Sequence, residues 1–371
     1  SNAMASGSGT GVAIGYYAHH KASNAYGNTA VGAYALQNTT TANYNTAIGK
    51  SAGASNVTGQ KNTLVGEGAG AAFTTTDSCT LIGYNAGNDI NSTGANGSVF
   101  IGLEAGAKVT SGERNTAVGY LALDSGTVNN QNTAVGYGTL SAISGSTSQG
   151  GNNTAIGYNA ALAMTTGNHN IAIGSSTMAD AAVTGDNNVA FGNGTLGALT
   201  SGTGNIGIGQ TALDQLTTSN YNTAIGTNAM GNVVHVNASA NIAIGYSALR
   251  GQGSQQIAGN IVLGYNAVSN TGIGALQNSV FIGYQAGAGV LTSDANGTVA
   301  IGYQAGYALT SGIGNIAIGY QALDAEDDGD YNTAIGYQAL TAQTGTSGTV
   351  GNTAVGYQAG SAITTGVFNT L

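Results

Sequence analysis

The sequence predicts an all-β solenoid, a chain wound into about twenty stacked coils of 17–21 residues. Three observations predict it. A nine-residue phrase recurs at a nearly fixed period, which is the signature of a solenoid. Within the phrase, β-branched residues two positions apart belong on one face of a short strand. The rest of each unit is mostly Gly, Ser, Thr, Asn and Asp, which are the residues of turns.

The phrase is clearest in "NIAIGYQAL" (Asn315 to Leu323) and "NTAIGYQAL" (Asn332 to Leu340). Alignment on its glycine gives twenty copies. Eleven of the nineteen intervals are 17 residues long and five are 19, so one repeat extends along the whole chain. We number the phrase in columns, from column one at its Asn to column five at its Gly, and onward to column nine.

Each column has a narrow composition. Column two is Thr, Ile or Val in all twenty copies, and column four is Ile, Val or Leu except at Phe191. Column six is Tyr in twelve copies and column eight is Ala in seventeen. Column five is always Gly, the residue that tolerates a sharp or left-handed bend. We expect these glycines to form the corners of the coil, among them Gly32, Gly49, Gly119, Gly226, Gly319 and Gly336.

Each repeat is therefore predicted to form a strand, a glycine corner, a second short strand and a polar return. Column one is Asn in fifteen copies. Stacked coils place like residues above one another, so these amides are expected to form a ladder along the axis, as stacked Asn residues do in cross-β structures.

Column three is Ala in fourteen copies, with Phe100 and Phe281 among the exceptions. If columns two and four fill the coil interior, column three lies on the opposite face, and a strand that is apolar on both faces is normally buried on both. We therefore predict that Phe100, Phe281 and Ala334 line an interface between identical chains. The alternative is a solvent-exposed sheet face lined with small residues.

Composition excludes several classes of protein. A net charge of −9 repels phosphate backbones, so nucleic-acid binding is not expected. The sequence has no run of eighteen apolar residues, so no membrane span is expected in this segment. Residues 1–10, which begin "SNA", are interpreted as a tag scar and leader. Residues 11–371 are expected to be one continuous repeat domain, cut at its C-terminal end within a further copy of the phrase.

The phrases "NTAIG", "NIAIG" and "TVAIG" resemble the head repeats of trimeric autotransporter adhesins of the YadA-like type, and "NTAIGYQAL" is similar to repeats of phage tail-fibre proteins. The resemblance covers about Gly11 to Gly360. It implies a left-handed parallel β-roll, a homotrimer with the first strand near the threefold axis, and an extracellular, cell-surface or virion fibre. The coils here are longer than those of the adhesin heads, and the additional residues are expected to form outer loops, where binding usually resides.

One stretch has the composition of a metal site. "DAEDDGD" places Asp324, Glu326, Asp327, Asp328 and Asp330 in one return loop, and carboxylates around a glycine can bind Ca²⁺. The alternative is a solvated acidic loop, and no other cofactor is expected. The adjacent His19 and His20 and the single Cys79 are interpreted as structural residues.

We therefore expect a fibre segment that binds a host-cell surface, a matrix protein or a glycan, and not an enzyme. The rival hypothesis is a glycan-degrading β-solenoid depolymerase, which needs paired carboxylates. Within one chain only the acidic loop near Asp327 could supply them, whereas Glu67, Glu104 and Glu113 could do so by facing a neighbouring chain. Two hypotheses concern surfaces. The column-six tyrosines form either an exposed binding stripe or a packed corner. Thr in ten of twenty column-two positions is too irregular to favour ice binding.

Overall fold

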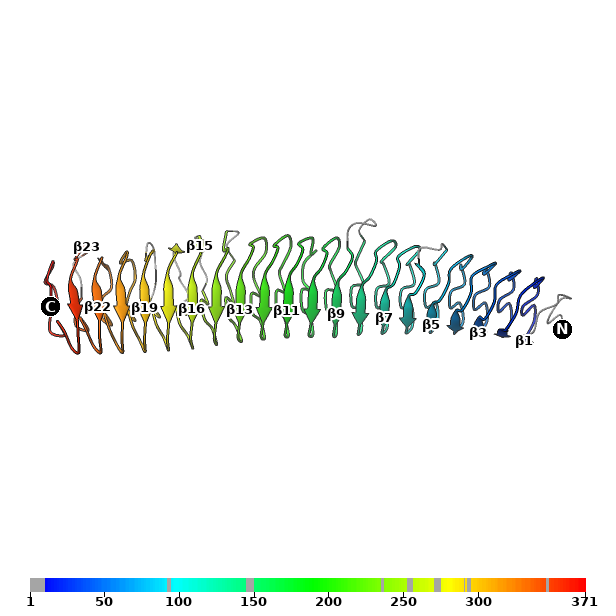
Figure 1. Cartoon of the computed structure of the whole chain (residues 1–371), viewed down its shortest axis with the longest axis horizontal. Coiled ribbons are helices and arrows are strands. Elements are labelled where there is room, and N and C mark those ends of the chain that lie inside the picture. Colours follow the sequence, from blue (N-terminus) through cyan, green and yellow to red (C-terminus); the bar gives the residue numbers. More distant parts are fainter. Residues whose placement is uncertain are drawn as a thin grey trace. The chain divides into compact units, whose positions relative to one another are not determined.

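The computed structural model describes residues 11–91, 95–144, 150–234, 237–251, 256–269, 275–289, 291, 295–344 and 347–371. The chain divides into two compact units, Ser1–Asp186 and Asn187–Leu371, and each is described by itself. Both consist of parallel stacked coils (Figure 1), which confirms the predicted all-β solenoid. Among these described residues no α-helix occurs, and hence none of the length and apolarity that a bilayer crossing requires.

In the first unit, each coil contributes one short strand that pairs in parallel with the strand of the next coil. The strands are β1 (Gly11–Ile14), β2 (Asn28–Val31), β3 (Thr46–Ile48), β4 (Thr63–Val65), β5 (Thr80–Ile82), β6 (Val99–Ile101), β7 (Thr116–Val118), β8 (Thr133–Val135), β9 (Thr154–Ile156) and β10 (Ile171–Ile173).

The second unit repeats this arrangement. Its main strands are β11 (Val189–Phe191), β12 (Ile206–Ile208), β13 (Thr223–Ile225), β14 (Ile242–Ile244), β16 (Ile261–Leu263), β18 (Val280–Ile282), β19 (Val299–Ile301), β20 (Ile316–Ile318), β22 (Thr333–Ile335) and β24 (Thr353–Val355). Two small sheets join the return segments, β15 (Ile257–Ala258) with β17 (Leu276–Gln277) and β21 (Gly329–Asp330) with β23 (Gly348–Thr349).

The strands keep the columns in register. Thr29 pairs with Thr46 across a 17-residue interval, and Thr133 pairs with Thr154 across a 21-residue interval. Additional residues in a coil therefore leave the stacking of the phrase unchanged, because the parallel ladder and the side chains above and below fix the register.

The structure corrects the assignment of the two strand faces. Phe100, Phe281 and Ala334 of column three are fully buried within a single chain, so they do not line an interface between chains. Columns two and four point outward instead, where Ile48 is 42% and Ile244 is 39% exposed. The reason is room. Column three shares the coil interior with the buried Asn of column one, and an interior this narrow accepts mostly Ala there.

The second predicted strand, after the corner, is also wrong. In this segment columns seven and nine adopt left-handed backbone angles, with φ of 54° at both Leu121 and Leu123, which a strand excludes. The backbone amides of these two columns donate their hydrogen bonds to coils on opposite sides. That of Leu121 donates to Leu103 O of the preceding coil at 3.1 Å, and that of Leu123 donates to Thr139 O of the following coil at 2.9 Å. The corner segment is thus a turn that still bonds to its neighbours on both sides.

The corner glycines have a backbone geometry that other residues rarely adopt. At Gly32, φ is 134°, and an added Cβ would lie 2.5 Å from the carbonyl oxygen of Gly49 in the next coil. At Gly226, φ is 130°, and a Cβ would approach Gly245 O equally closely. The same column has φ between 130° and 141° at all six candidate corners, Gly32, Gly49, Gly119, Gly226, Gly319 and Gly336.

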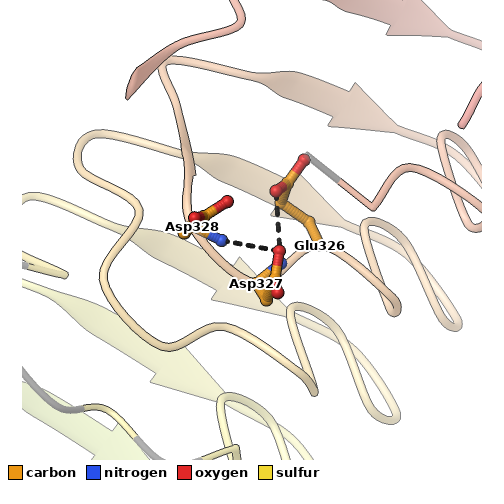
Figure 2. A group of neighbouring side chains, drawn as sticks. All are labelled: Glu326, Asp327 and Asp328. Atoms are coloured by element: carbon orange, nitrogen blue, oxygen red, sulfur yellow. Dashed lines mark hydrogen bonds between the residues drawn. The ribbon is translucent and has the colours of Figure 1, made fainter. Parts of the chain in front are cut away.

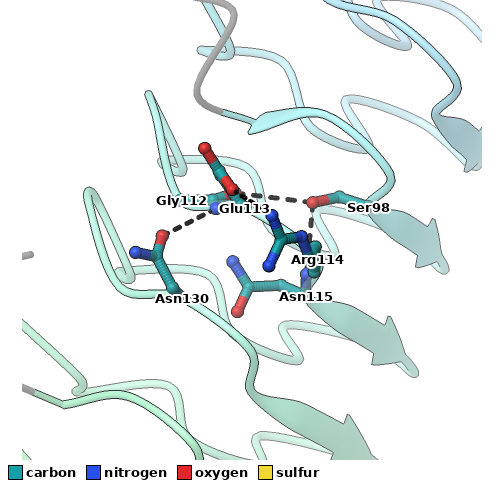
Figure 3. A network of polar contacts seen from close by, with 6 residues as sticks. All are labelled: Ser98, Gly112, Glu113, Arg114, Asn115 and Asn130. Carbon is teal, nitrogen blue, oxygen red and sulfur yellow. Dashed lines mark hydrogen bonds and ion pairs between the residues drawn. The ribbon is translucent and has the colours of Figure 1, made fainter.

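The Asn ladder of column one is present and buried. Asn28 Oδ1 accepts a hydrogen bond from the backbone amide of Asn45 at 2.9 Å, and Asn28 Nδ2 donates to Ala42 O in the return segment at 2.7 Å. The amides thus join successive coils and also tie each strand to its own return. Where column one is Ser98, its hydroxyl replaces the amide by accepting from Asn115 N at 3.3 Å (Figure 3).

A second polar ladder lies two residues before column one, and the sequence analysis missed it. Asn130 Oδ1 accepts from Glu113 N at 2.8 Å (Figure 3), and Asp330 Oδ1 accepts from Ile313 N at 2.8 Å. Only some of the coils have Asn or Asp at this position, so the composition of the repeat did not reveal the ladder. Its members satisfy backbone amides of the return segment.

Candidate functional site

The acidic loop divides into residues with different roles. Glu326, Asp327 and Asp328 lie together in the structure, with one ligand atom from each residue within 4.8 Å of the others (Figure 2). Asp324 and Asp330 are not members of this group. Burial raises the pKa of Asp324. Asp330 Oδ1 accepts a hydrogen bond from the backbone amide of Ile313 in the return segment of the preceding coil.

Glu326 is a residue of the coil interior and not of the solvated loop. Its side chain is fully buried, and Oε1 accepts from Gly329 N at 2.8 Å and from Asp327 N at 3.2 Å. Asn56, seven residues after its own corner glycine as Glu326 is, makes the equivalent bond to Gly59 N at 2.9 Å. This geometry indicates a turn-capping role for Glu326. Binding of Ca²⁺ to the loop stays a prediction.

Two of the other three carboxylates considered for glycan cleavage, Glu67 and Glu113, lie beside basic side chains. Glu67 Oε1 is 2.8 Å from Lys50 Nζ, and Glu113 Oε2 is 3.2 Å from Arg114 Nη2 (Figure 3). Glu104 lies near enough to Asp124 to affect its titration. Exposed ion pairs of this kind contribute little to stability.

The column-six tyrosines are exposed and stacked. In the second unit seven rings form a continuous stack, with neighbouring centroids 5.0–5.4 Å apart and ring planes within 15° of parallel. We call this the tyrosine ladder; its members are Tyr246, Tyr265, Tyr284, Tyr303, Tyr320, Tyr337 and Tyr357.

A glutamine ladder runs beside it in column seven. Gln304 Nε2 donates to Gln285 Oε1 at 3.1 Å, and Gln321 Nε2 donates to Gln304 Oε1 at 3.2 Å. Because each inner tyrosine is covered on both ring faces by its neighbours, the tyrosine ladder presents ring edges and hydroxyls to solvent. A ligand that needs to stack on an aromatic face has no access to one within the ladder.

A shorter stack in the first unit borders a hollow. Tyr137 and Tyr158 are stacked with centroids 5.2 Å apart and planes 15° from parallel, and Tyr120 adjoins Tyr137 at 5.3 Å. Column seven of these three coils is Leu121, Gly138 and Asn159. A hollow of about 460 Å³ lies around Gly138. It is lined by Leu121, Asp124, Ser125, Tyr137, Gly138, Ser141, Ala142, Tyr158, Asn159 and Leu162.

The outward side chains of columns two and four form a further surface, which we call the outer sheet face. No residue in either column is charged in any of the twenty coils. Column two contains Thr in seven of ten coils of the first unit and in three of ten of the second. The outer sheet face is therefore uncharged throughout and more aliphatic in the second unit.

His19 and Cys79 both have buried positions. His19 is 2% exposed, and burial lowers its pKa below the usual 6.5. Cys79 is buried in column one, where burial raises the pKa of its thiol to about 11. A thiol that stays protonated at neutral pH is a poor nucleophile, which agrees with the interpretation of Cys79 as a small buried residue.

No family model matches the chain, and a comparison with curated proteins finds no match either.

Proposed function

We propose that the chain is a structural and adhesive fibre segment, a tail fibre or the head of a surface adhesin, whose copies assemble side by side as a homotrimer. Its place is extracellular, on a cell surface or a virion. The outer loops then contact a host-cell surface, a matrix protein or a glycan. The observation that carries the proposal is the outer sheet face, which is uncharged in both units, aliphatic in column four and uncovered within a single chain.

The character of this face favours a second copy of the chain as its partner. Ile48, Ile244 and Ile335 are each about two-fifths exposed (37–42%), although the coils above and below them pack closely. A partner has to match a repeat of one strand per coil over many coils, and a copy of the same chain has that repeat. The absence of charge in columns two and four also means that two chains of net charge −9 bring no like charges together there.

The polar exterior supports the adhesive half of the proposal. The corner segments carry the exposed tyrosines and the glutamine ladder, and acidic side chains such as Asp327 and Asp328 lie in the returns. A rigid scaffold with variable outer loops is the usual arrangement of binding surfaces. The acidic balance disfavours nucleic acid as the target.

The assembly is tested by light scattering on a variant in which Ile208, Ile244 and Ile335 are all replaced by Lys. The parent chain is expected to have three times the 36.2 kDa mass of one chain. The variant is expected to have the mass of one chain and to keep its β-sheet circular dichroism, because the new charges lie outside the coil. A control that replaces the exposed Ser201, Gln215 and Thr344 by Lys adds the same charge elsewhere. A parent that is a stable single chain at micromolar concentration contradicts the trimer.

A further inference from the structure

We infer that the hollow at Gly138 is a binding subsite for one neutral hexose unit of a glycan. The inference rests on the proposed adhesive function and names its ligand class. The hollow lies wholly within the first unit, has a volume of about 460 Å³ and is broadly open to solvent, so a sugar could enter it without a change in the coils. Its lining combines an apolar wall with a wall of hydrogen-bond acceptors.

The apolar wall is rigid. Tyr137 and Tyr158 are held against each other at 5.2 Å, and Leu121 and Leu162 lie beside the hollow on either side of Gly138 in the stack. The C–H groups of a pyranose ring can pack against this wall of leucine side chains and tyrosine ring edges, and the ordered tyrosines lose little side-chain entropy on binding.

The polar wall provides acceptors for sugar hydroxyls. Asn159 Oδ1 is buried and accepts no hydrogen bond from any residue that the structure describes. A buried acceptor without a donor is costly. A rotation of the Asn159 amide toward the hollow would let a ligand hydroxyl supply that donor. The Asp124 side chain is 17% exposed, with Oδ2 3.8 Å from Lys108 Nζ, and it offers a second acceptor beside the hydroxyls of Ser125 and Ser141.

The backbone around the hollow disfavours a peptide ligand. The amide of Leu121 donates to Leu103 O, that of Gly138 donates to Tyr120 O at 3.0 Å, and that of Asn159 donates to Tyr137 O at 2.9 Å. These groups are already paired between coils, so an added strand finds no free amides here. Recognition therefore depends on side chains, as it does for a sugar.

Charge selects a neutral sugar over an anionic one. Asp124 lies in the lining, and the chain carries a net charge of −9. A sialic or uronic acid would bring its carboxylate beside this aspartate, and Lys108 is already paired with it.

The test is saturation-transfer-difference NMR with the methyl glycosides of glucose, galactose, mannose, N-acetylglucosamine and N-acetylneuraminic acid. The full chain is expected to give signals with at least one of the four neutral glycosides and none with the sialoside. The matched variant is Gly138→Asn, whose side chain would occupy part of the hollow and crowd its lining. Asn holds column seven with φ near 52° at Asn85 and Asn159, so the backbone angle suits it. An added Cβ would lie 2.7 Å from Asn159 Oδ1, so the Asn159 side chain has to shift as well.

The control variant is Gly194→Asn. Gly194 is in the same column with a similar φ of 63°, but its column-six neighbour is Asn193 and not Tyr. We expect at least a tenfold loss of affinity in Gly138→Asn, none in Gly194→Asn, and a partial loss in Asp124→Asn. Unchanged binding in a folded Gly138→Asn, no neutral-glycoside signal at tens of millimolar, or preference for the sialoside would each overturn the inference.

The same samples separate this inference from the proposed function. Light scattering reports the assembly independently of sugar binding. A trimer that binds no glycoside refutes the subsite alone, whereas a single chain that binds one refutes the fibre alone. Release of new reducing ends from neutral oligosaccharides would assign hydrolysis to the site and refute a role limited to binding.

Discussion

The ring of Phe100 lies against Gly106, where an added Cβ would come within 2.5 Å of Phe100 Cδ2. Phe100 is in column three and Gly106 is in column nine of the same coil. Where column three is small, column nine is usually large, as at Ala117 and Leu123. Both columns point into one narrow interior, so their volumes vary inversely at constant packing density.

This pairing predicts a double-mutant cycle. Phe100→Ala alone should lower the free energy of unfolding by about 3–5 kcal/mol, because it leaves a cavity. Gly106→Leu alone should destabilise by about 1–3 kcal/mol through overpacking. The double variant recreates the Ala117 and Leu123 combination, in which Leu123 already adopts φ of 54°. It should recover at least about 1 kcal/mol relative to the sum. Urea unfolding measures all three variants, and strict additivity would contradict shared packing.

The corner geometry predicts unequal costs for two Gly→Ala changes. At Gly319, φ is 137° and the backbone of Gly336 occupies the place of a Cβ, so Ala requires the coils to separate. At Gly297, φ is 70° and no atom lies within 4 Å of an added Cβ, so only the left-handed strain of about 1–2 kcal/mol remains. Thermal unfolding should therefore show a clearly larger loss for Gly319→Ala. Equal losses of thermal stability in the two variants would mean that the contact between coils adds nothing to the cost of the Gly319→Ala substitution.

The column pattern predicted the coil, its register and the buried amide ladder, because each follows from residue type at a fixed period. It did not reveal which strand face is inside. Both faces of "TAI" are apolar, and β-branched residues suit a core as well as a sheet surface. The width of the coil interior decides which strand face is buried, and that width depends on where the chain turns back. The hollow at Gly138 was missed for a similar reason, since it requires three coils to lie side by side.

Neighbouring residues of β22 test the corrected faces. Ala334→Asp places a charge inside the coil, where Ala334 is fully buried, and should destabilise the chain by several kcal/mol whatever its assembly state. Ile335→Asp places the charge on the outer sheet face, where Ile335 is 37% exposed, and should leave the coil folded. Chemical unfolding on a background held as a single chain by Ile208→Lys and Ile244→Lys separates the two effects. Equal loss in both variants would contradict the assignment of faces.

The turn-capping role of Glu326 makes a prediction about the acidic loop. Glu326→Gln keeps an oxygen that can accept from Gly329 N, so its unfolding free energy should stay within about 1 kcal/mol of the parent value. Glu326→Ala removes the acceptor from a buried amide and should cost about 1–3 kcal/mol more. Calorimetric titration with Ca²⁺ is the companion measurement. Binding heat in the parent that is lost in Glu326→Gln would assign Glu326 to a cation and not to the turn alone.

His19 predicts a pH dependence confined to the first coil. Asn28 Nδ2 lies 3.4 Å from His19 Nε2, a contact that suits a neutral ring, and burial lowers the folded-state pKa below the usual 6.5. The unfolded segment therefore binds a proton at a higher pH than the folded one. The contribution of the neutral His19 ring to the stability of the first coil is thus complete above about pH 6.5 and is lost as the pH falls below that value.

Amide protection factors at pH 7.5 and pH 5 measure this directly, using the bonds from His19 N to Ala35 O at 2.9 Å and from Lys21 N to Gln37 O at 3.1 Å. Both should lose protection at pH 5, while amides of later coils do not. His19→Leu is the matched control, because Leu36 holds the same column of the next coil with φ of 49°. Protection in this variant should not depend on pH. Equal pH dependence in His19→Leu would show that another group controls the fraying of the first coil.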